Sequence, residues 1–198
     1  MAEEKGRPMD RANWVRVYHA YFQSMVVRGL SELAFRTLGS EVGFNVVAET
    51  VERGAMKGFK VLMEELSKEG LKLNELSLKE LIRYEVDCHK YAVERMGVGF
   101  QVFEEAREEE PGRRYVLYTR NCKYHELAKK IPTVCGVCVG LTAGILRQAG
   151  YKVRWLSSPM RKKQLCLSKP GDRPEYVVYR DPGTKPPECK LVIEKLEC

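Results

Sequence analysis

The segment Val134–Gln148 reads VCGVCVGLTAGILRQ and carries a glycine at every fourth position from 136 to 144. Its apolar pattern predicts a helix. Residues four apart share one helix face, so Gly136, Gly140 and Gly144 leave that face almost bare of side chains. Because each glycine weakens a helix by about 1 kcal/mol, three on one line need a packing or binding reason. We expect this face to lie against a sheet, another helix or a ligand at close range.

Metal-binding side chains gather around the start of this helix. They are Cys122, His125, Cys135 and Cys138, spaced C-x2-H-x9-C-x2-C, with Cys166 further downstream. Thiolates and imidazole at such separations can converge on one Zn²⁺, and the positive end of the helix dipole favours the thiolate form at its first turn. We predict that four of the five bind a metal, with zinc favoured over an iron–sulfur cluster. Four protein ligands make a structural site, whereas three leave a position open for catalysis.

Other interpretations of the cysteines stay open. The cluster can consist of small buried hydrophobes, with His125 on the surface, or Cys135 and Cys138 can form a redox pair. Cys189 and Cys198 can pair with each other or with another chain, or remain free thiols. Cys88 is most simply a small buried hydrophobe.

The first part of the chain is predicted to be helical. Apolar residues recur at spacings of three and four over residues 10–70, and this stripe is larger than a small domain needs, so part of it is expected to face a partner subunit. Ser77 and Glu80 form a capping box for a helix that runs to about Met96. His89 lies in the apolar register of that helix, either as a core histidine or as a pocket or metal residue.

Strand signals alternate with helices in the rest of the chain. A hairpin bent at Pro111–Gly112 is predicted, with the acidic run 104–110 falling in its turn. Its strands and those that follow are expected at 100–103, 115–118, 151–156, 164–167 and 174–180, with 191–193 as an edge strand after the proline-rich link at 182–187. The order predicts an α+β domain with an antiparallel sheet and the glycine-rich helix between two hairpins.

Composition narrows the class of protein. No apolar run approaches the roughly 18–20 residues of a membrane helix and no signal peptide is evident, so membrane insertion is not expected and a cytoplasmic location is. Four Asn and four Gln among 198 residues favour a thermophilic source, where intracellular disulfides do occur. From Arg113 onward there are 18 Lys/Arg and 7 Asp/Glu. These cations are dispersed without interleaved aromatic residues, so a nucleic-acid partner is not expected.

The C-terminal half resembles the 4-vinyl reductase domain family. The resemblance rests on Val134–Cys135, the Gly140-Leu-Thr-Ala-Gly144 run, Val153-Arg-Trp155, Cys166 with Gly171–Asp172, and Tyr176-Val-Val-Tyr179, and it spans about residues 30–180. Cys135 and Cys166 match cysteines of the family. A further family cysteine falls where this chain has Tyr176, and Cys138 and His125 are interpreted as local replacements.

This resemblance implies a fold like that of vesicle-tethering (TRAPP-type) subunits and haem-NO-binding domains. N-terminal helices would pack on a four-stranded antiparallel sheet, often in a dimer, and the domain would bind a small molecule or hydrocarbon. We expect a dimerisation segment at 1–70, a ligand-binding core at 71–181 and a tail at 182–198, with 30–180 forming one folded unit.

The predicted function is that of a cytoplasmic, archaeal, homodimeric binding module. A small apolar or aromatic ligand would lie between the helical layer and the sheet, and the metal would fix the loop at 122–138. The predicted pocket residues are His89, Phe100, Phe103, Tyr118 and the face formed by Gly136, Gly140 and Gly144. The alternatives are a metal-dependent hydrolase or reductase on the same scaffold, or a partner of a transcriptional regulator.

Overall fold

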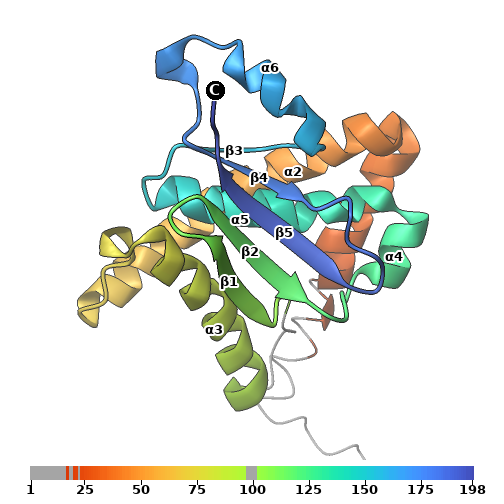
Figure 1. Ribbon diagram of the computed structural model, residues 1–198. Helices are drawn as coiled ribbons and strands as arrows, with labels where there is room; N and C mark the ends of the chain where they lie inside the picture. Colours follow the sequence, from red (N-terminus) through yellow and green to blue (C-terminus); the bar gives the residue numbers. More distant parts are fainter. Residues whose placement is uncertain (1–16, 18–19, 22, 97–101) are drawn as a thin grey trace, which may run out of the picture.

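A computed structural model describes residues 17, 20, 21, 23–96 and 102–198. Its centre is a five-stranded sheet in the order β1-β2-β5-β4-β3 (Figure 1). The strands are β1 (Glu105–Glu110), β2 (Arg114–Thr119), β3 (Val153–Trp155), β4 (Tyr176–Arg180) and β5 (Cys189–Lys195). Neighbouring strands are antiparallel except β3 and β4, which are parallel. The α+β class is thus confirmed, but the sheet has five strands and is mixed, instead of four and antiparallel.

Two strand predictions and one turn prediction are wrong in informative ways. Residues 191–193 belong to β5, which lies in the middle of the sheet, not at its edge. The segment predicted as a strand at 164–167 forms the short helix α6 (Lys162–Cys166) and its end. The acidic run expected in a turn is β1 itself, in register with β2 from Glu105 opposite Tyr118. As an edge strand with mostly exposed side chains, β1 needs no apolar residues to be stable. The bend at Pro111–Gly112 is confirmed, with φ +68° at Gly112.

The helices include two long ones, α2 (Gly29–Lys68) and α3 (Leu78–Met96). A π-helical turn, Gln23–Arg28, precedes α2. Gly39 has φ +75° and a non-helical conformation, so α2 bends sharply there. The capping box of α3 is confirmed, because the Ser77 N–H donates to the Glu80 carboxylate and the Glu80 N–H donates to the Ser77 hydroxyl. Besides α6, the described residues also form the α-helices α4 (His125–Lys130) and α5 (Cys135–Gln148) and several single 3-10 turns.

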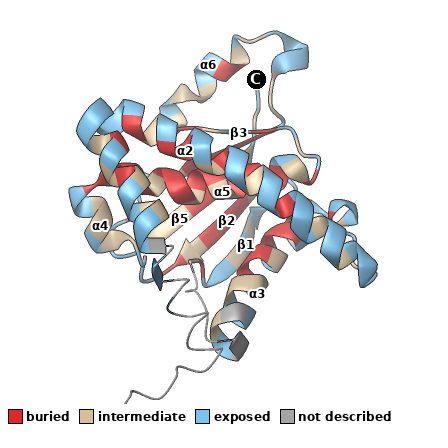
Figure 2. Ribbon diagram, turned by 180° about the vertical axis from the view of Figure 1, so that it is seen from behind, coloured by how far each residue is buried: buried red, intermediate tan, exposed pale blue. Residues whose placement is uncertain are grey.

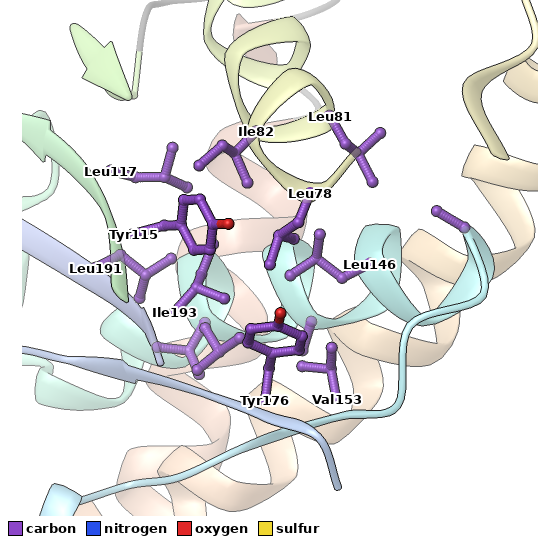
Figure 3. Packing of buried hydrophobic residues seen from close by; sticks show 14 of the residues in the cluster. Leu78, Leu81, Ile82, Tyr115, Leu117, Leu146, Val153, Tyr176, Leu191 and Ile193 are labelled. Carbon is purple, nitrogen blue, oxygen red and sulfur yellow. The ribbon is translucent and has the colours of Figure 1, made fainter. Parts of the chain in front are cut away.

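The main core lies between one face of the sheet and the helices (Figure 3). Buried side chains from the sheet meet others from α3 and α5; the labelled ones are Leu78, Leu81, Ile82, Tyr115, Leu117, Leu146, Val153, Tyr176, Leu191 and Ile193. The opposite face carries a smaller cluster, in which Leu165 of α6 contributes to covering Val116, Val177 and Val192. Because β5 is buried on both faces, its Leu191-Val192-Ile193 run is continuous rather than alternating.

The glycine face of α5 lies against α2 (Figure 2). A Cβ added at Gly136 would lie 2.9 Å from the Phe44 carbonyl oxygen, and one at Gly144 would lie 2.5 Å from that of Glu52. A Cβ at Gly140 would be closer still to the carbonyl oxygen of Ala48. The three glycines of α5 and their three partners on α2 are each spaced by four residues and follow the same order along the chain. The two helices therefore run parallel, and their backbones touch along two turns. The bare face therefore serves helix packing, one of the three alternatives that the sequence left open.

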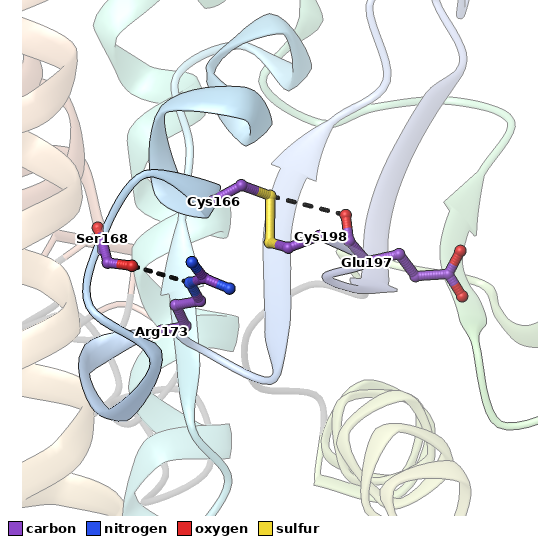
Figure 4. The surroundings of a disulfide bond; sticks show 5 residues. All are labelled: Cys166, Ser168, Arg173, Glu197 and Cys198. Carbon is purple, nitrogen blue, oxygen red and sulfur yellow. Dashed lines mark hydrogen bonds between the residues drawn. A yellow bond between two sulfur atoms is a disulfide. The ribbon is translucent and has the colours of Figure 1, made fainter.

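The chain leaves the sheet after β3 and returns at β4 through residues 157–174, here called the β3–β4 excursion. It contains α6, and Cys166 at the end of α6 forms a disulfide with Cys198, which joins the excursion to the segment after β5 (Figure 4). Arg161 pairs with Glu41 of α2, and Lys162 pairs with Glu194 of β5. Cys198 is thus bonded to Cys166 and not to Cys189, which is free.

Among the described residues, no helix combines the length and the apolar character needed to cross a bilayer.

We predict opposite effects of alanine at two glycines. Gly140→Ala should lower the free energy of unfolding by about 1–3 kcal/mol, because its methyl group would overlap the α2 backbone. Gly58→Ala should raise it by about 0.5–1 kcal/mol, because Gly58 lies within α2 with nothing near its added Cβ. Chemical denaturation of both variants checks this, and equal effects would contradict the packing described for α5.

Candidate thiol site beside Arg180

Four cysteines from three parts of the chain meet at one end of the sheet. Cys135 and Cys138 lie on the first turn of α5. Cys122 follows β2, and its N–H donates to the Pro187 carbonyl oxygen at 2.9 Å, which fixes this loop beside the one before β5. Cys189 begins β5 opposite Thr119 of β2. The β2–β5 pairing thereby brings the loop cysteine and the strand cysteine to the start of α5.

Arg180, the last residue of β4, is the cation of this site. Burial would lower the pKa of its guanidinium, but the neighbouring Cys135, Cys189 and Cys122 thiols raise it above its ordinary value. Within the described part of the chain, Arg180 forms no ion pair with a carboxylate. The positive charge is therefore directed to the sulfur atoms.

Cys122 is the thiol best suited to lose its proton. A hydrogen bond from the Cys189 thiol lowers the pKa of Cys122, against the opposing effect of burial. The backbone N–H groups of Tyr124 and His125 and the charge of Arg180 lower it further. The same hydrogen bond, together with burial, raises the pKa of Cys189. The pair thus favours a thiolate at Cys122 with Cys189 as its donor.

The two cysteines of α5 are half-buried and favour the protonated thiol form. Burial raises the pKa of both Cys135 and Cys138, and the nearby Cys122 raises each further. For Cys138 the Glu85 carboxyl adds to this effect. Without a metal, these two thiols keep their protons at neutral pH; a thiolate-binding cation would reverse that preference.

A buried carboxyl lies next to the thiol site. Glu85 is on α3, and the Thr142 hydroxyl of α5 donates to its Oε1 at 3.2 Å. Its Oε2 has no hydrogen-bond partner among the described residues. Burial raises the pKa of Glu85 to about 7. One turn further along α3, burial lowers the pKa of His89, which favours the neutral imidazole.

The structure brings together three of the five predicted metal ligands. Cys122, Cys135 and Cys138 share the site, but the disulfide of Cys166 holds its sulfur elsewhere. The His125 imidazole lies 3.5 Å from the Glu126 carboxylate and contributes only its backbone N–H to the site. The sequence did not predict Cys189 as a ligand, because it reaches the site only through the pairing of β5 with β2. In the described residues, no three His, Cys, Asp or Glu side chains already surround a common point as metal ligands.

The predicted pocket residues are dispersed. Phe103 is part of the main core. Tyr118 lies on the opposite face of the sheet, with the Arg107 guanidinium 4.9 Å from its ring centroid. The space beside Gly136, Gly140 and Gly144 is filled by α2. Phe100 lies outside the described residues. Gly136 lies between Cys135 and Cys138 of the thiol site, and His89 lies one turn from Glu85 on α3.

Comparison with known proteins adds no relative. No protein-family model matches the chain, and no curated protein sequence matches it. The likeness to 4-vinyl reductase domains therefore stays a prediction.

We predict that Cys122 is alkylated at lower pH than Cys88. Both thiols are half-buried, but the surroundings of Cys122 lower its pKa, whereas burial raises that of Cys88. In chelator-treated protein, pulse labelling with iodoacetamide across a pH series and peptide mapping measures both midpoints. Cys189→Ala should move the Cys122 midpoint to higher pH because it removes the thiol donor. A midpoint that does not move would contradict the pairing.

We predict that Glu85 makes the protein less stable as the pH rises. Its pKa is about 7 when folded, against an ordinary 4.5, so the folded protein holds this proton more tightly than the unfolded chain. The stabilisation is complete below about pH 4.5 and is lost as the pH rises through about 7. Gln cannot ionise, so the Glu85→Gln variant does not lose this stability. Its free energy of unfolding, relative to that of the wild type, should therefore rise by up to about 3 kcal/mol between pH 5 and pH 8. Urea denaturation at both values, with exposed Glu64→Gln as the control, tests this; a constant difference would refute it.

Proposed function

We propose that the chain is a small-molecule-binding domain stabilised by a zinc-type metal site formed by Cys122, Cys135, Cys138 and Cys189. The observation that carries the metal site is the convergence of these four thiols from three segments beside Arg180. Four cysteines are a common ligand set of structural zinc. The metal would join the start of α5 to the loop after β2 and to the first residue of β5.

The charge of the surroundings supports this ligand set. Zinc bound by four thiolates carries a net charge of about −2, and burying such a charge requires a compensating group. Arg180 is half-buried and points its charge toward the same thiols. Since all four positions would be filled by protein, the metal would have no open position for a water or substrate. This favours a binding module over a metal-dependent hydrolase or reductase.

An iron–sulfur cluster is the alternative occupant, because it uses the same four thiolates. The two are distinguished by colour, since clusters of this kind absorb visible light and zinc does not.

A second copy of this chain is the proposed partner. Several large apolar side chains are exposed on α2, among them Leu33 at 66% and Val42 at 52% of full exposure. Such residues are usual singly but are expected at an interface when they recur on one element. This supports the homodimer that the sequence predicts through its N-terminal helices.

The test is native mass spectrometry of freshly purified protein with elemental analysis. We expect a dimer with one zinc per chain. Cys135→Ser should lose most of its zinc, because one ligand of four is removed, whereas Cys88→Ser should retain it, because Cys88 lies on α3 outside the site. A metal-free wild type with all four thiols reactive, or equal zinc loss in both variants, would refute the metal site.

A further inference from the structure

A cavity of about 890 Å³ runs along α2, and the one α5 residue that lines it, Arg147, lies at the opposite end of that helix from Cys135 and Cys138. Its other walls come from the edge strand β3 and the β3–β4 excursion. The volume falls in the range of roughly 300–1,000 Å³ that is typical of small-molecule sites. None of the pocket residues predicted from the sequence lines it.

The lining of this cavity has an excess of positive charge. Five of its side chains are Lys or Arg and three are Glu or Asp. Two of the acids already have cationic partners, since Glu52 accepts from Arg147 at 2.7 Å and Glu49 accepts from Arg53 at 2.7 Å. A concave surface with such an excess concentrates the field and attracts anions.

Three of the cations are available to a ligand. Among the described residues, Lys152, Arg154 and Arg173 form no ion pair, whereas Arg147 and Arg161 each bind a carboxylate of α2. Arg154 is exposed on β3. The Nε of Arg173 donates to the Ser168 carbonyl oxygen at 2.8 Å (Figure 4), which leaves its terminal nitrogens free to bind. Two guanidinium groups and an ammonium are the donors that bind phosphate oxygens best.

The side of the cavity next to α2 is rigid and polar. The Glu52 carboxylate holds both Arg147 and the Trp155 indole N–H, the latter at 2.8 Å. The Trp155 ring also makes an edge contact with Phe44, with centroids 6.1 Å apart. The Oδ1 atom of Asn45, another lining residue, is buried without a hydrogen-bond partner among the described residues. Solvent does not reach this atom, so it adds polarity to the wall without being a contact for a ligand.

We propose that this cavity binds a phosphorylated small molecule about the size of a mononucleotide. Arg154 and Arg173 bind its phosphate oxygens, Lys152 adds to the positive field, and Trp155 faces the rest of the ligand. The excursion supplies Arg173, and the Cys166–Cys198 disulfide and the Arg161–Glu41 pair hold the excursion in place. The site shares no residue with the proposed metal site, so either proposal can fail without the other.

The test is isothermal titration of the purified protein with three probes: ADP, pyrophosphate and adenosine. ADP should bind and adenosine should not, because the phosphates supply the recognised charge. Arg154→Gln and Arg173→Gln should each weaken ADP binding about tenfold, the effect of losing one charge-assisted hydrogen bond. Lys163→Gln is the matched control, because Lys163 is exposed on α6 and does not line the cavity; it should leave the affinity unchanged.

Pyrophosphate binding as tight as that of ADP would show that the phosphate alone is recognised, and weaker binding would show that the ring contributes; both support the site. Absence of heat with ADP and pyrophosphate at millimolar concentration would overturn it. So would adenosine binding as tightly as ADP, or affinity that responds equally to Lys163→Gln and Arg154→Gln. Circular dichroism verifies that each variant is folded, and the exposed position of Arg154 makes that variant informative even if Arg173→Gln is unstable.

Discussion

The close contact between α2 and α5 fixes the helix on which both candidate sites depend. Three glycines let the two backbones touch, and their partners on α2 are spaced by the same four residues. This fixes α5 in its position, in its rotation and along its axis. One end of α5 then presents Cys135 and Cys138 to β5, and the other end presents Arg147 to Glu52 of α2. The thiol site and the basic cavity are thus held at a set separation by one helix.

Local signals in the sequence were sufficient for several elements of the fold. The Ser77–Glu80 capping box, the bend at Pro111–Gly112 and the glycine-rich helix each depend on neighbouring residues, and each is present. The position of β5 depends instead on pairing with strands far away in the sequence. A short apolar run after a proline-rich link is compatible with an edge or a central strand, and only burial on both faces decides between them. The acidic run that forms β1 was predicted as a turn for a similar reason. Charged residues are compatible with an exposed edge strand as well as with a turn, and only the pairing with β2 decides between them.

The candidate site was predictable to the extent that its ligands are close in sequence. Cys135 and Cys138 share a helical turn, and Cys122 lies in the preceding loop, so spacing identified them. Cys189 reaches them only through the pairing of β2 with β5. Cys166 was expected at the site, but it lies at the end of α6 in the β3–β4 excursion, where it is bonded to Cys198. Its position also depends on the strand order and not on spacing in the sequence. Arg180 carried no signal in the sequence, since its role comes from lying at the end of β4 beside thiols from other segments.

The composition of β1 also bears on how copies of the chain can associate. Its residues, Glu-Ala-Arg-Glu-Glu-Glu, place five charged side chains along a free edge of the sheet. An unpaired strand edge is otherwise a template for adding a strand from another molecule. Glu105, Glu108 and Glu109 pair with Arg107, Lys79 and Arg114 of the same chain. Four carboxylates against one Arg nevertheless leave an excess of negative charge on the strand, which opposes the docking of an identical strand beside it. Fibril growth by sheet extension is therefore disfavoured at this edge.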